Sequence, residues 1–344
     1  MNNIMLSFLK KFFLFLIPFL LLFFIYLIWD PFMVLYDYDH FNREPHIHKN
    51  RDYVSTEMFI KNSGKYEYDS YILGASNSRF IPPGIWRNYI DTKNNIFSFD
   101  ASGENIVGIW SKIKYLEAKG HNIKNALVVI DPVVFDPFVN NMPIYMKHYE
   151  VYPSSKYYFQ YAYFLQFLNL RFIVSQIQYM ITGRLTDKFE NVFETTYYYN
   201  DVITNEFHNV GVLNELKTDS LGYYKRRKDK FVTRTGTYSE GKEKINEEHI
   251  GMLTEIKDVF EKNNTEYRVI ITPIYDQIAY NRHDKSILQN IFGEDYVFDF
   301  SGINEITQEM SNYYDTFHFK QYIGKRLLDS AYSENPAMRG YVIN

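Results

Sequence analysis

The chain has 344 residues, enough for one large domain or two smaller ones. Its net charge is -4 and it has no long basic block, which argues against a nucleic acid partner. Cysteine is absent, so disulfides, thiolate metal sites and cysteine nucleophiles are excluded. Aromatic residues make up 19% of the chain, and we assign most of these rings to the core and a minority to a surface for sugars or membrane.

An uncharged run near the N-terminus predicts a membrane anchor. Residues 12–29 read FFLFLIPFLLLFFIYLIW, and as a helix they would span about 27 Å, close to the thickness of a bilayer core. Lys10 and Lys11 precede the run, so the positive-inside rule places the N-terminus in the cytoplasm and the rest outside. A cleaved signal peptide is the alternative, but no A-x-A cleavage pattern follows. We therefore expect residues 1–30 to form a cytoplasmic stub and an uncleaved single-pass anchor.

Residues 31–66 are expected to be a stalk, and residues 67–332 an α/β domain. Apolar strands alternate there with helical segments, which favours a three-layer α/β/α arrangement around a parallel five-stranded sheet. Helices are expected at 104–119, where apolar residues recur at steps of three and four, and at 319–332. Residues 333–344 form a tail. The expected strands are 70–73, 95–100, 126–131, 267–273 and 296–302.

A long insertion separates the third and fourth expected strands. Residues 132–266 are far longer than an ordinary crossover, so we expect an inserted, mainly helical cap at about 135–262. Its central segment, 157–181, contains Arg171 and several Gln and Asn residues, which makes a second membrane span costly. An amphipathic or buried helix is favoured, and a helix lying on the membrane surface stays open.

Polar residues directly follow the first strand, in the stretch YILGASNSRF at 71–80. In an open α/β sheet the reactive site lies beyond the carboxyl ends of the strands, where Ser76 would stand. The segment YYDTFHF before the last helix adds Asp315 and His318, three residues apart. A serine needs a base to accept its proton, and a histidine base needs a carboxylate to fix its tautomer. We therefore predict a Ser-His-Asp relay.

Two neighbouring residues are candidates for substrate contact. Gly103 lies in the loop after the second strand, and without a side chain its N–H can approach a substrate closely. The outward-pointing backbone N–H groups of the turn at Ser76 can stabilise an oxyanion. Arg79 would bind an anionic group, with an exposed salt bridge as an equal alternative.

These residues carry a family resemblance. LGASNS after a first strand, a glycine after the second and D-x-x-H before a C-terminal helix resemble the SGNH (GDSL-like) hydrolase superfamily. More narrowly, residues 67–332 resemble membrane-anchored extracytoplasmic members of cell-envelope acylation, such as the alginate acetylation and teichoic-acid D-alanylation proteins. The resemblance implies Ser76 as nucleophile, His318 as base, Asp315 as its partner and Gly103 in the oxyanion hole. It implies ester hydrolysis or acyl transfer with no metal and no other cofactor.

The chain departs from the family pattern at two places. The usual G-D-S is G-A-S at 74–76, and Asp131 replaces the usual asparagine after the third strand. An ionised carboxylate there would repel an oxyanion, so Asp131 must point elsewhere, be protonated or mark altered chemistry. Asn105 or Asn77 would then supply the missing donor.

We thus expect an anchored serine esterase or O-acyltransferase that acts on a cell-envelope glycan or glycolipid. Its partners would be the lipid bilayer around residues 12–29, the glycan and, by resemblance, a membrane-bound acyltransferase. The alternative is a catalytically inactive glycan-binding or assembly protein beside such an acyltransferase. A metal-dependent phosphatase or sulfatase-like enzyme would instead need Asp131, Asp315 and His318 as ligands, with Asp136 too far along the loop to help.

Overall fold

The computed structural model describes residues 3–43, 47–140, 142–184, 192–193, 197–234 and 236–333. The chain divides into two compact units, which are described one at a time. The first consists of Met1–Lys49 and Ser154–Thr195, and the second of Asn50–Pro153 and Thr196–Asn344. The expected tail at 333–344 lies outside the described residues apart from Ser333.

The first unit contains a long apolar helix, α1 (Asn3–Trp29). Its segment Met5–Trp29 has a mean hydropathy of 2.7 and is long and apolar enough to cross a membrane or to act as a signal anchor. The chain leaves α1 in a turn around Asp30, whose carboxylate accepts the N–H groups of Val34 at 3.0 Å and Leu35 at 2.8 Å. These hydrogen bonds satisfy the charged group that ends the apolar run.

The helix expected at 157–181 is in fact two helices, α5 (Lys156–Phe167) and α6 (Leu170–Thr182). Asn169 separates them, because its side chain accepts the N–H of Arg171 at 2.9 Å and so caps a new helix. Both helices belong to the first unit, together with α1.

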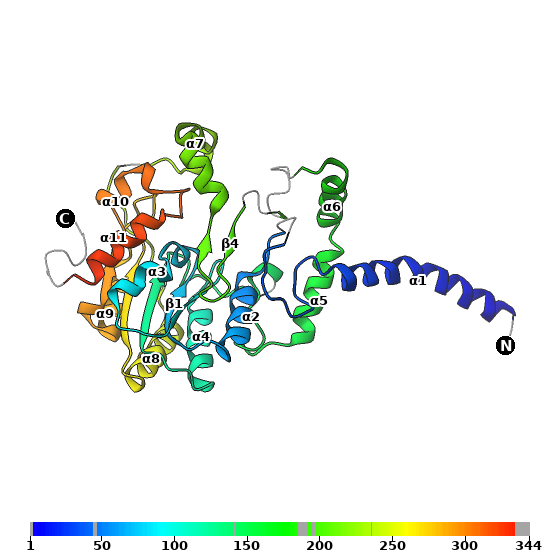
Figure 1. Cartoon of the computed structure of the whole chain (residues 1–344), viewed down its shortest axis with the longest axis horizontal. Coiled ribbons are helices and arrows are strands. Elements are labelled where there is room, and N and C mark those ends of the chain that lie inside the picture. The colour runs from blue at the N-terminus through cyan, green and yellow to red at the C-terminus, as the bar shows by residue number, and fades with distance from the viewer. Residues whose placement is uncertain are drawn as a thin grey trace. The chain divides into compact units, whose positions relative to one another are not determined.

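The second unit is built on a five-stranded parallel sheet, which confirms the predicted fold class at this level. The strands follow the order β2-β1-β3-β6-β7. Every residue of β1 and β3 is buried, as expected for central strands covered on both faces. The strands are β1 (Tyr68–Gly74), β2 (Asn95–Asp100), β3 (Asn125–Ile130), β6 (Glu266–Ile271) and β7 (Val297–Asp299) (Figure 1).

Helices accompany this sheet along the chain. Among them, α4 packs against α8, and α11 packs against β6 and α3 (Figure 1). Two short antiparallel strands, β4 (Tyr199–Asn200) and β5 (Phe207–His208), form a separate hairpin. The helices are α2 (Arg51–Ser63), α3 (Pro83–Trp86), α4 (Ile106–Ala118), α7 (Val210–Arg226), α8 (Glu247–Lys262), α9 (Arg282–Phe292), α10 (Glu305–Gln308) and α11 (Gln321–Ala331).

One hydrophobic cluster joins the sheet to α3 and α11. Ile72, Leu127 and Ile270 contribute from β1, β3 and β6, and they meet Trp86 of α3 and Leu327 of α11. All five side chains are fully buried. Each buried aliphatic side chain of this size contributes about 1.5–3 kcal/mol. The packing therefore fixes α11, and the loop that precedes it, against the sheet.

The segment expected as a stalk contains a folded helix. α2 lies within residues 31–66, and it starts at Asn50, whose side chain accepts the N–H of Tyr53 at 2.9 Å. Val54 and Phe59 of this helix are buried. The linker expectation fails here because α2 packs onto β2 as part of the second unit.

The long segment between β3 and β6 is divided between the two units. Residues 154–195 belong to the first unit, and the flanking parts belong to the second. The last helix before β6 is α8, which lies beside α4. An inserted cap at about 135–262 stays a prediction.

Candidate active site

The strand register brings the candidate segments to one edge of the sheet. Gly74, at the end of β1, lies opposite Asp100 of β2 and Val129 of β3. Ile130 of β3 in turn lies opposite Ile271 of β6. Because all these strands are parallel, the residues that follow them emerge at the same, carboxyl edge.

At this edge Ser76, His318 and Asp315 form a hydrogen-bonded chain. The hydroxyl of Ser76 lies 2.8 Å from Nε2 of His318. Nδ1 of the same ring lies 2.8 Å from Oδ2 and 3.0 Å from Oδ1 of Asp315. The three side chains are only partly buried, so solvent or a ligand can reach the serine hydroxyl. The structure thus brings together the three residues that the sequence analysis grouped.

The loop carrying Asp315 and His318 is tightly held. Oδ1 of Asp315 accepts the backbone N–H groups of Phe317 at 2.8 Å and His318 at 2.9 Å. The N–H of Tyr314 donates to the carbonyl of His318 at 2.8 Å, which closes the loop on itself. The hydroxyl of Tyr223, on α7, donates to the carbonyl of Tyr314 at 2.9 Å. Backbone and neighbouring side chains therefore both orient the imidazole.

The ionised form of Asp315 suits its role as the hydrogen-bond partner of His318. Burial acts to raise its pKa, but the His318 ring and the hydrogen bonds that the carboxylate accepts outweigh burial. The pKa of Asp315 is consequently lowered. An ionised carboxylate accepts the Nδ1–H of His318 and leaves Nε2 free to accept the serine proton.

Ser76 opens a short 3₁₀ turn, η1 (Ser76–Phe80), whose position depends on two close backbone approaches. At Gly74, a Cβ would lie 2.7 Å from the carbonyl oxygen of Val129, so only glycine fits before the turn. At Gly324, on α11, a Cβ would lie 2.1 Å from the carbonyl oxygen of Phe80. These contacts bring the turn against β3 on one side and α11 on the other.

Asn77 links the serine turn to both β3 and the histidine loop. Its side-chain amide donates to Oδ1 of Asp131 and to the carbonyl of Phe317, each at 3.0 Å. Its backbone N–H donates to Oδ2 of Asp131 at 3.2 Å. These protein acceptors occupy the donors of Asn77 in this structure, and its role as an oxyanion donor stays a prediction. Asn77 is a positioning residue in this structure.

Asp131, the residue that follows β3, accepts hydrogen bonds from two neighbouring side chains. Besides Asn77, it accepts the hydroxyl of Thr272 at 2.8 Å. Burial raises the pKa of Asp131, and the hydrogen bonds from Thr272 and Asn77 only partly oppose this effect. Of the alternatives for Asp131, its orientation toward Asn77 and Thr272 describes this structure, and its raised pKa favours the protonated form.

Arg79 forms a buried ion pair and is not aimed at an open anion site. Its Nε lies 2.6 Å from Asp100, and its Nη2 donates to Ser102 at 2.8 Å. Arg51 of α2 lies 2.7 Å from the same carboxylate. Burial acts to raise the pKa of Asp100, but the two guanidinium groups lower it to about 2. The salt-bridge alternative for Arg79 is thus the one that forms, and Asn205 completes the network.

Gly103 lies in the loop after β2, next to a second buried charge cluster. Gly103 is exposed and adopts a φ of +57°. Beside it, Glu104 pairs with Lys112 at 2.6 Å and also with Lys147, while Lys112 lies 3.2 Å from Asp52. Two carboxylates and two ammonium groups balance each other inside the protein. This cluster fixes the loop that presents Gly103.

Donors for an oxyanion remain at two backbone positions. Within the part of the chain that the structure describes, neither the N–H of Ser76 nor that of Gly103 has a hydrogen-bond acceptor. Asn105 uses its side-chain oxygen to cap α4, where it accepts the N–H of Gly108 at 3.2 Å. Its role as a donor stays a prediction. Asn105 and Gly103 line a cavity of about 180 Å³ with Tyr145 and Lys147.

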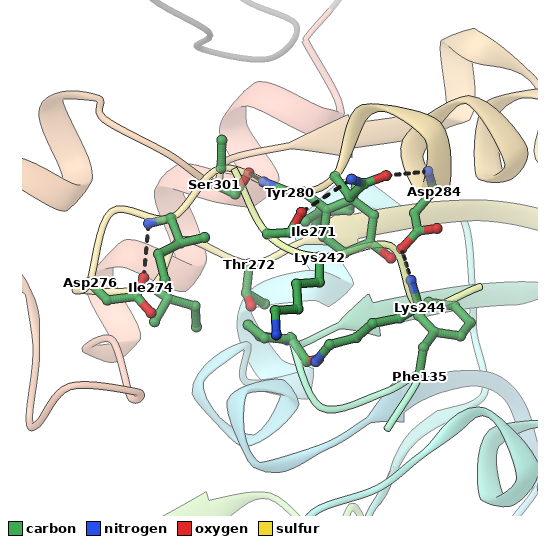
Figure 2. A pocket seen from close by; sticks show the side chains of 15 residues that line it. Phe135, Lys242, Lys244, Ile271, Thr272, Ile274, Asp276, Tyr280, Asp284 and Ser301 are labelled. Atoms are coloured by element: carbon green, nitrogen blue, oxygen red, sulfur yellow. Dashed lines mark hydrogen bonds between the residues drawn. The ribbon is translucent and has the colours of Figure 1, made fainter. Parts of the chain in front are cut away.

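A separate, mostly apolar cavity lies beyond the ends of β3, β6 and β7. It has a volume of about 250 Å³ and includes Thr272, Lys242 and Tyr280 in its lining (Figure 2). The Thr272 hydroxyl that bonds Asp131 therefore belongs to the wall of this cavity. None of the three residues of the Ser-His-Asp chain lines it.

Sequence reasoning missed the buried ions that support the site. Arg51, Asp100, Glu104 and Lys112 are all buried, and the Arg51–Asp100 pair joins residues 49 positions apart in the sequence. The available signal was Asp100 at the end of a strand whose residues Ile96, Phe97 and Phe99 are apolar, because a buried carboxylate requires a cation or several donors. That signal shows the need for a partner without identifying Arg51 as the partner.

Among the described residues, no three His, Asp or Glu side chains are grouped as metal ligands. Asp131 lies with Asn77 and Thr272, whereas Asp315 and His318 pair with each other.

No protein-family model matches the chain, and no curated protein matches it.

Proposed function

We propose that the chain is a serine esterase or O-acyltransferase of the SGNH (GDSL-like) type. The observation that carries this proposal is the hydrogen-bonded chain from the Ser76 hydroxyl through His318 to Asp315. The residues come from the end of β1 and from the loop before α11, which is the order that the family resemblance requires. The finer fold expectation, a three-layer sandwich with an inserted helical cap, belongs to the same proposal.

In the first half of the reaction, Oγ of Ser76 attacks the carbonyl carbon of an ester. Nε2 of His318 accepts the hydroxyl proton as the new C–O bond forms. The ionised Asp315 holds the Nδ1–H and stabilises the imidazolium. Collapse of the tetrahedral intermediate expels the alcohol, which takes the proton from Nε2, and leaves an acyl group on Ser76.

The negative oxygen of that intermediate needs donors. The N–H groups of Ser76 and Gly103 are our candidates, because they have no acceptor among the described residues. Asp131 is held by Asn77 and Thr272, and its raised pKa favours a neutral carboxyl. This arrangement directs the carboxyl to Asn77 and Thr272, and the raised pKa reduces the share of the ionised form that would repel the oxyanion.

In the second half, the acyl group passes to water or to a hydroxyl of an acceptor. His318 takes the proton of the incoming nucleophile and returns it to Ser76. The apolar α1 would hold the protein in the membrane, with the second unit on the extracytoplasmic side. We therefore propose a cell-envelope glycan or glycolipid as acceptor or donor, and a membrane-bound acyltransferase as partner.

Labelling with a fluorophosphonate probe tests the proposal. The full-length protein should be labelled, Ser76→Ala should lose the label, and Ser102→Ala should keep it. Ser102 is a matched control because it lies on the neighbouring loop at the same edge and its hydroxyl accepts a hydrogen bond from Arg79. Circular dichroism should show that all three proteins are folded. Equal labelling of Ser76→Ala, or none of the wild type, would favour the non-catalytic glycan-binding alternative.

A further inference from the structure

An exposed apolar band runs along α5 and α6 of the first unit. On α6, the side chains of Leu170, Val174, Ile177 and Ile181 are exposed by 73%, 45%, 51% and 79%. Their spacing of four, three and four residues places them on one face of the helix. Met180, beside this face, is 82% exposed.

The band continues on α5 with aromatic side chains. Tyr157, Tyr158 and Tyr161 are exposed by 88%, 50% and 56%, and Leu165 by 47%. The exposed face of α11, by contrast, carries the charged residues Lys325, Arg326 and Asp329. We call the nine exposed apolar residues of the two helices the α5–α6 band.

The two helices are joined to α1 by rings. The ring of Phe164 on α5 lies 5.5 Å from that of Phe23, and the ring of Phe172 on α6 lies 6.1 Å from that of Trp29. Phe23 stands six residues before Trp29, or about 9 Å along the helix axis. If Trp29 marks the interface, α5 therefore touches α1 at the level of the hydrocarbon.

The direction of the helices fits the plane of a membrane. Figure 1 shows α5 and α6 at the C-terminal end of α1, running across its direction. A helix that runs across a membrane-spanning helix lies along the bilayer surface. An apolar side chain on such a helix can enter the acyl-chain region while the backbone stays near the headgroups.

The charge of the segment also favours a membrane surface. Residues 156–184 include Lys156, Arg171 and Arg184 and contain no Asp or Glu. All three cations are exposed. Basic residues that flank an apolar helical face are attracted to anionic lipid headgroups.

We propose that the α5–α6 band inserts into the interface of the membrane that α1 crosses, as a second, monotopic membrane contact. The inference rests on the proposed anchoring by α1. It assigns the segment at 157–181, for which the sequence left a buried helix and a surface-lying helix open, to the lipid surface. The occupant of the band is lipid, and the exposed rings and aliphatic chains are the inserted groups.

Single-cysteine labelling of the full-length protein tests this inference, because the chain contains no native cysteine. An environment-sensitive fluorophore is attached at Val174→Cys or Ile177→Cys, and the protein is placed in nanodiscs of phosphatidylglycerol and phosphatidylcholine. With brominated acyl chains we expect the label at either position to lose most of its emission. A label at Leu221→Cys, on α7 and 88% exposed, should keep its emission.

A label at Leu20→Cys in α1 separates the two proposals. Quenching at position 20 without quenching at 174 or 177 would overturn the α5–α6 contact and leave the anchor intact. The absence of quenching at position 20 would instead refute the anchor. If labels at 174 and 177 became shielded only on addition of a second membrane protein, the occupant would be that protein, and the lipid proposal would fail.

Discussion

At the scale of single residues, the proposed chemistry of Ser76, His318 and Asp315 depends on which ring nitrogen of His318 carries the proton. The lowered pKa of Asp315 keeps its carboxylate ionised at neutral pH, so it accepts the Nδ1–H of His318. Nε2 is then the acceptor that faces the Ser76 hydroxyl at 2.8 Å. A small chemical change at Asp315 should therefore alter the tautomer and preserve the shape of the site.

Asp315→Asn should abolish most of the proposed esterase activity. The asparagine amide would donate to Nδ1, which would put the proton on Nε2 and prevent His318 from accepting the serine proton. We expect a fall of roughly 10³- to 10⁴-fold in kcat, measured with an acetyl ester. Asp136→Asn, at an exposed carboxylate bound to Lys244, is the control and should keep its activity. Full activity of Asp315→Asn would show that the carboxylate has no such role.

Asp131 gives a second prediction, on stability as a function of pH. Its folded-state pKa is raised above the ordinary value of 3.8, so the folded protein binds its proton more tightly than the unfolded chain does. Its stabilising contribution is present below that ordinary value and is lost as the pH rises through the folded pKa.

The substitution Asp131→Asn removes this titration. Denaturant unfolding between pH 4 and pH 7 should show the wild type losing stability relative to Asp131→Asn as the pH rises. The lowered pKa of Asp100 has the opposite sign, because its stabilisation is lost as the pH falls below about 3.8 toward about 2. The two effects therefore fall in separate pH windows. Parallel curves for wild type and Asp131→Asn would contradict a raised pKa.

At the scale of elements, the site is assembled by the approach of α11 to the serine turn. Gly324 lets the helix backbone reach the carbonyl of Phe80, which is the last residue of η1. Phe80 also packs its ring 5.6 Å from that of His318. One helix contact thus sets the distance between the two sides of the Ser-His-Asp chain.

Gly324→Ala should weaken both folding and the proposed activity. A Cβ at this position would lie 2.1 Å from the Phe80 carbonyl oxygen, so α11 must shift. We expect a loss of about 1–3 kcal/mol in the free energy of unfolding, together with reduced fluorophosphonate labelling of Ser76.

Gly251→Ala is the matched control, because it lies within α8 and its Cβ would meet nothing within 4 Å. It should gain about 0.5–1 kcal/mol and keep its labelling. Normal stability of Gly324→Ala would show that the close approach does not constrain the site.

The local sequence pattern predicted those helices and strands whose residues share one kind of environment, such as a buried strand. β2 was expected at 95–100 and has those bounds. β3 was expected at 126–131 from a continuous apolar run, which is typical of a buried parallel strand, and it spans Asn125–Ile130. The helix α2 was missed because Arg51 and Asp52 at its start are buried by partners elsewhere in the chain. The relay residues were found because their chemistry limits the choice of residue types. The positioning role of Asn77 was not predicted, since one of its hydrogen-bond acceptors, the carbonyl of Phe317, lies 240 residues away in the sequence.

At the scale of the whole molecule, the two units have different proposed functions. The first contains α1 and the exposed apolar residues of the α5–α6 band. The second contains the sheet and the Ser-His-Asp chain. Between β3 and β6 the polypeptide leaves the second unit, enters the first unit and then returns to the second. The segment proposed to contact the membrane and the segments proposed to carry catalysis are thus interleaved in sequence, and neither unit is a continuous piece of chain.

The proposed topology gives the last prediction. If α1 crosses the membrane with Lys10 and Lys11 on the cytoplasmic side, every exposed residue of the second unit lies outside. A cysteine at Lys262, on α8 and 71% exposed in its side chain, should then react with a membrane-impermeant maleimide in intact cells or spheroplasts. A cysteine at Asn3, at the start of α1, should react only after the membrane is permeabilised, because it would lie on the cytoplasmic side. The opposite pattern would place the second unit in the cytoplasm and would exclude an envelope glycan as its substrate.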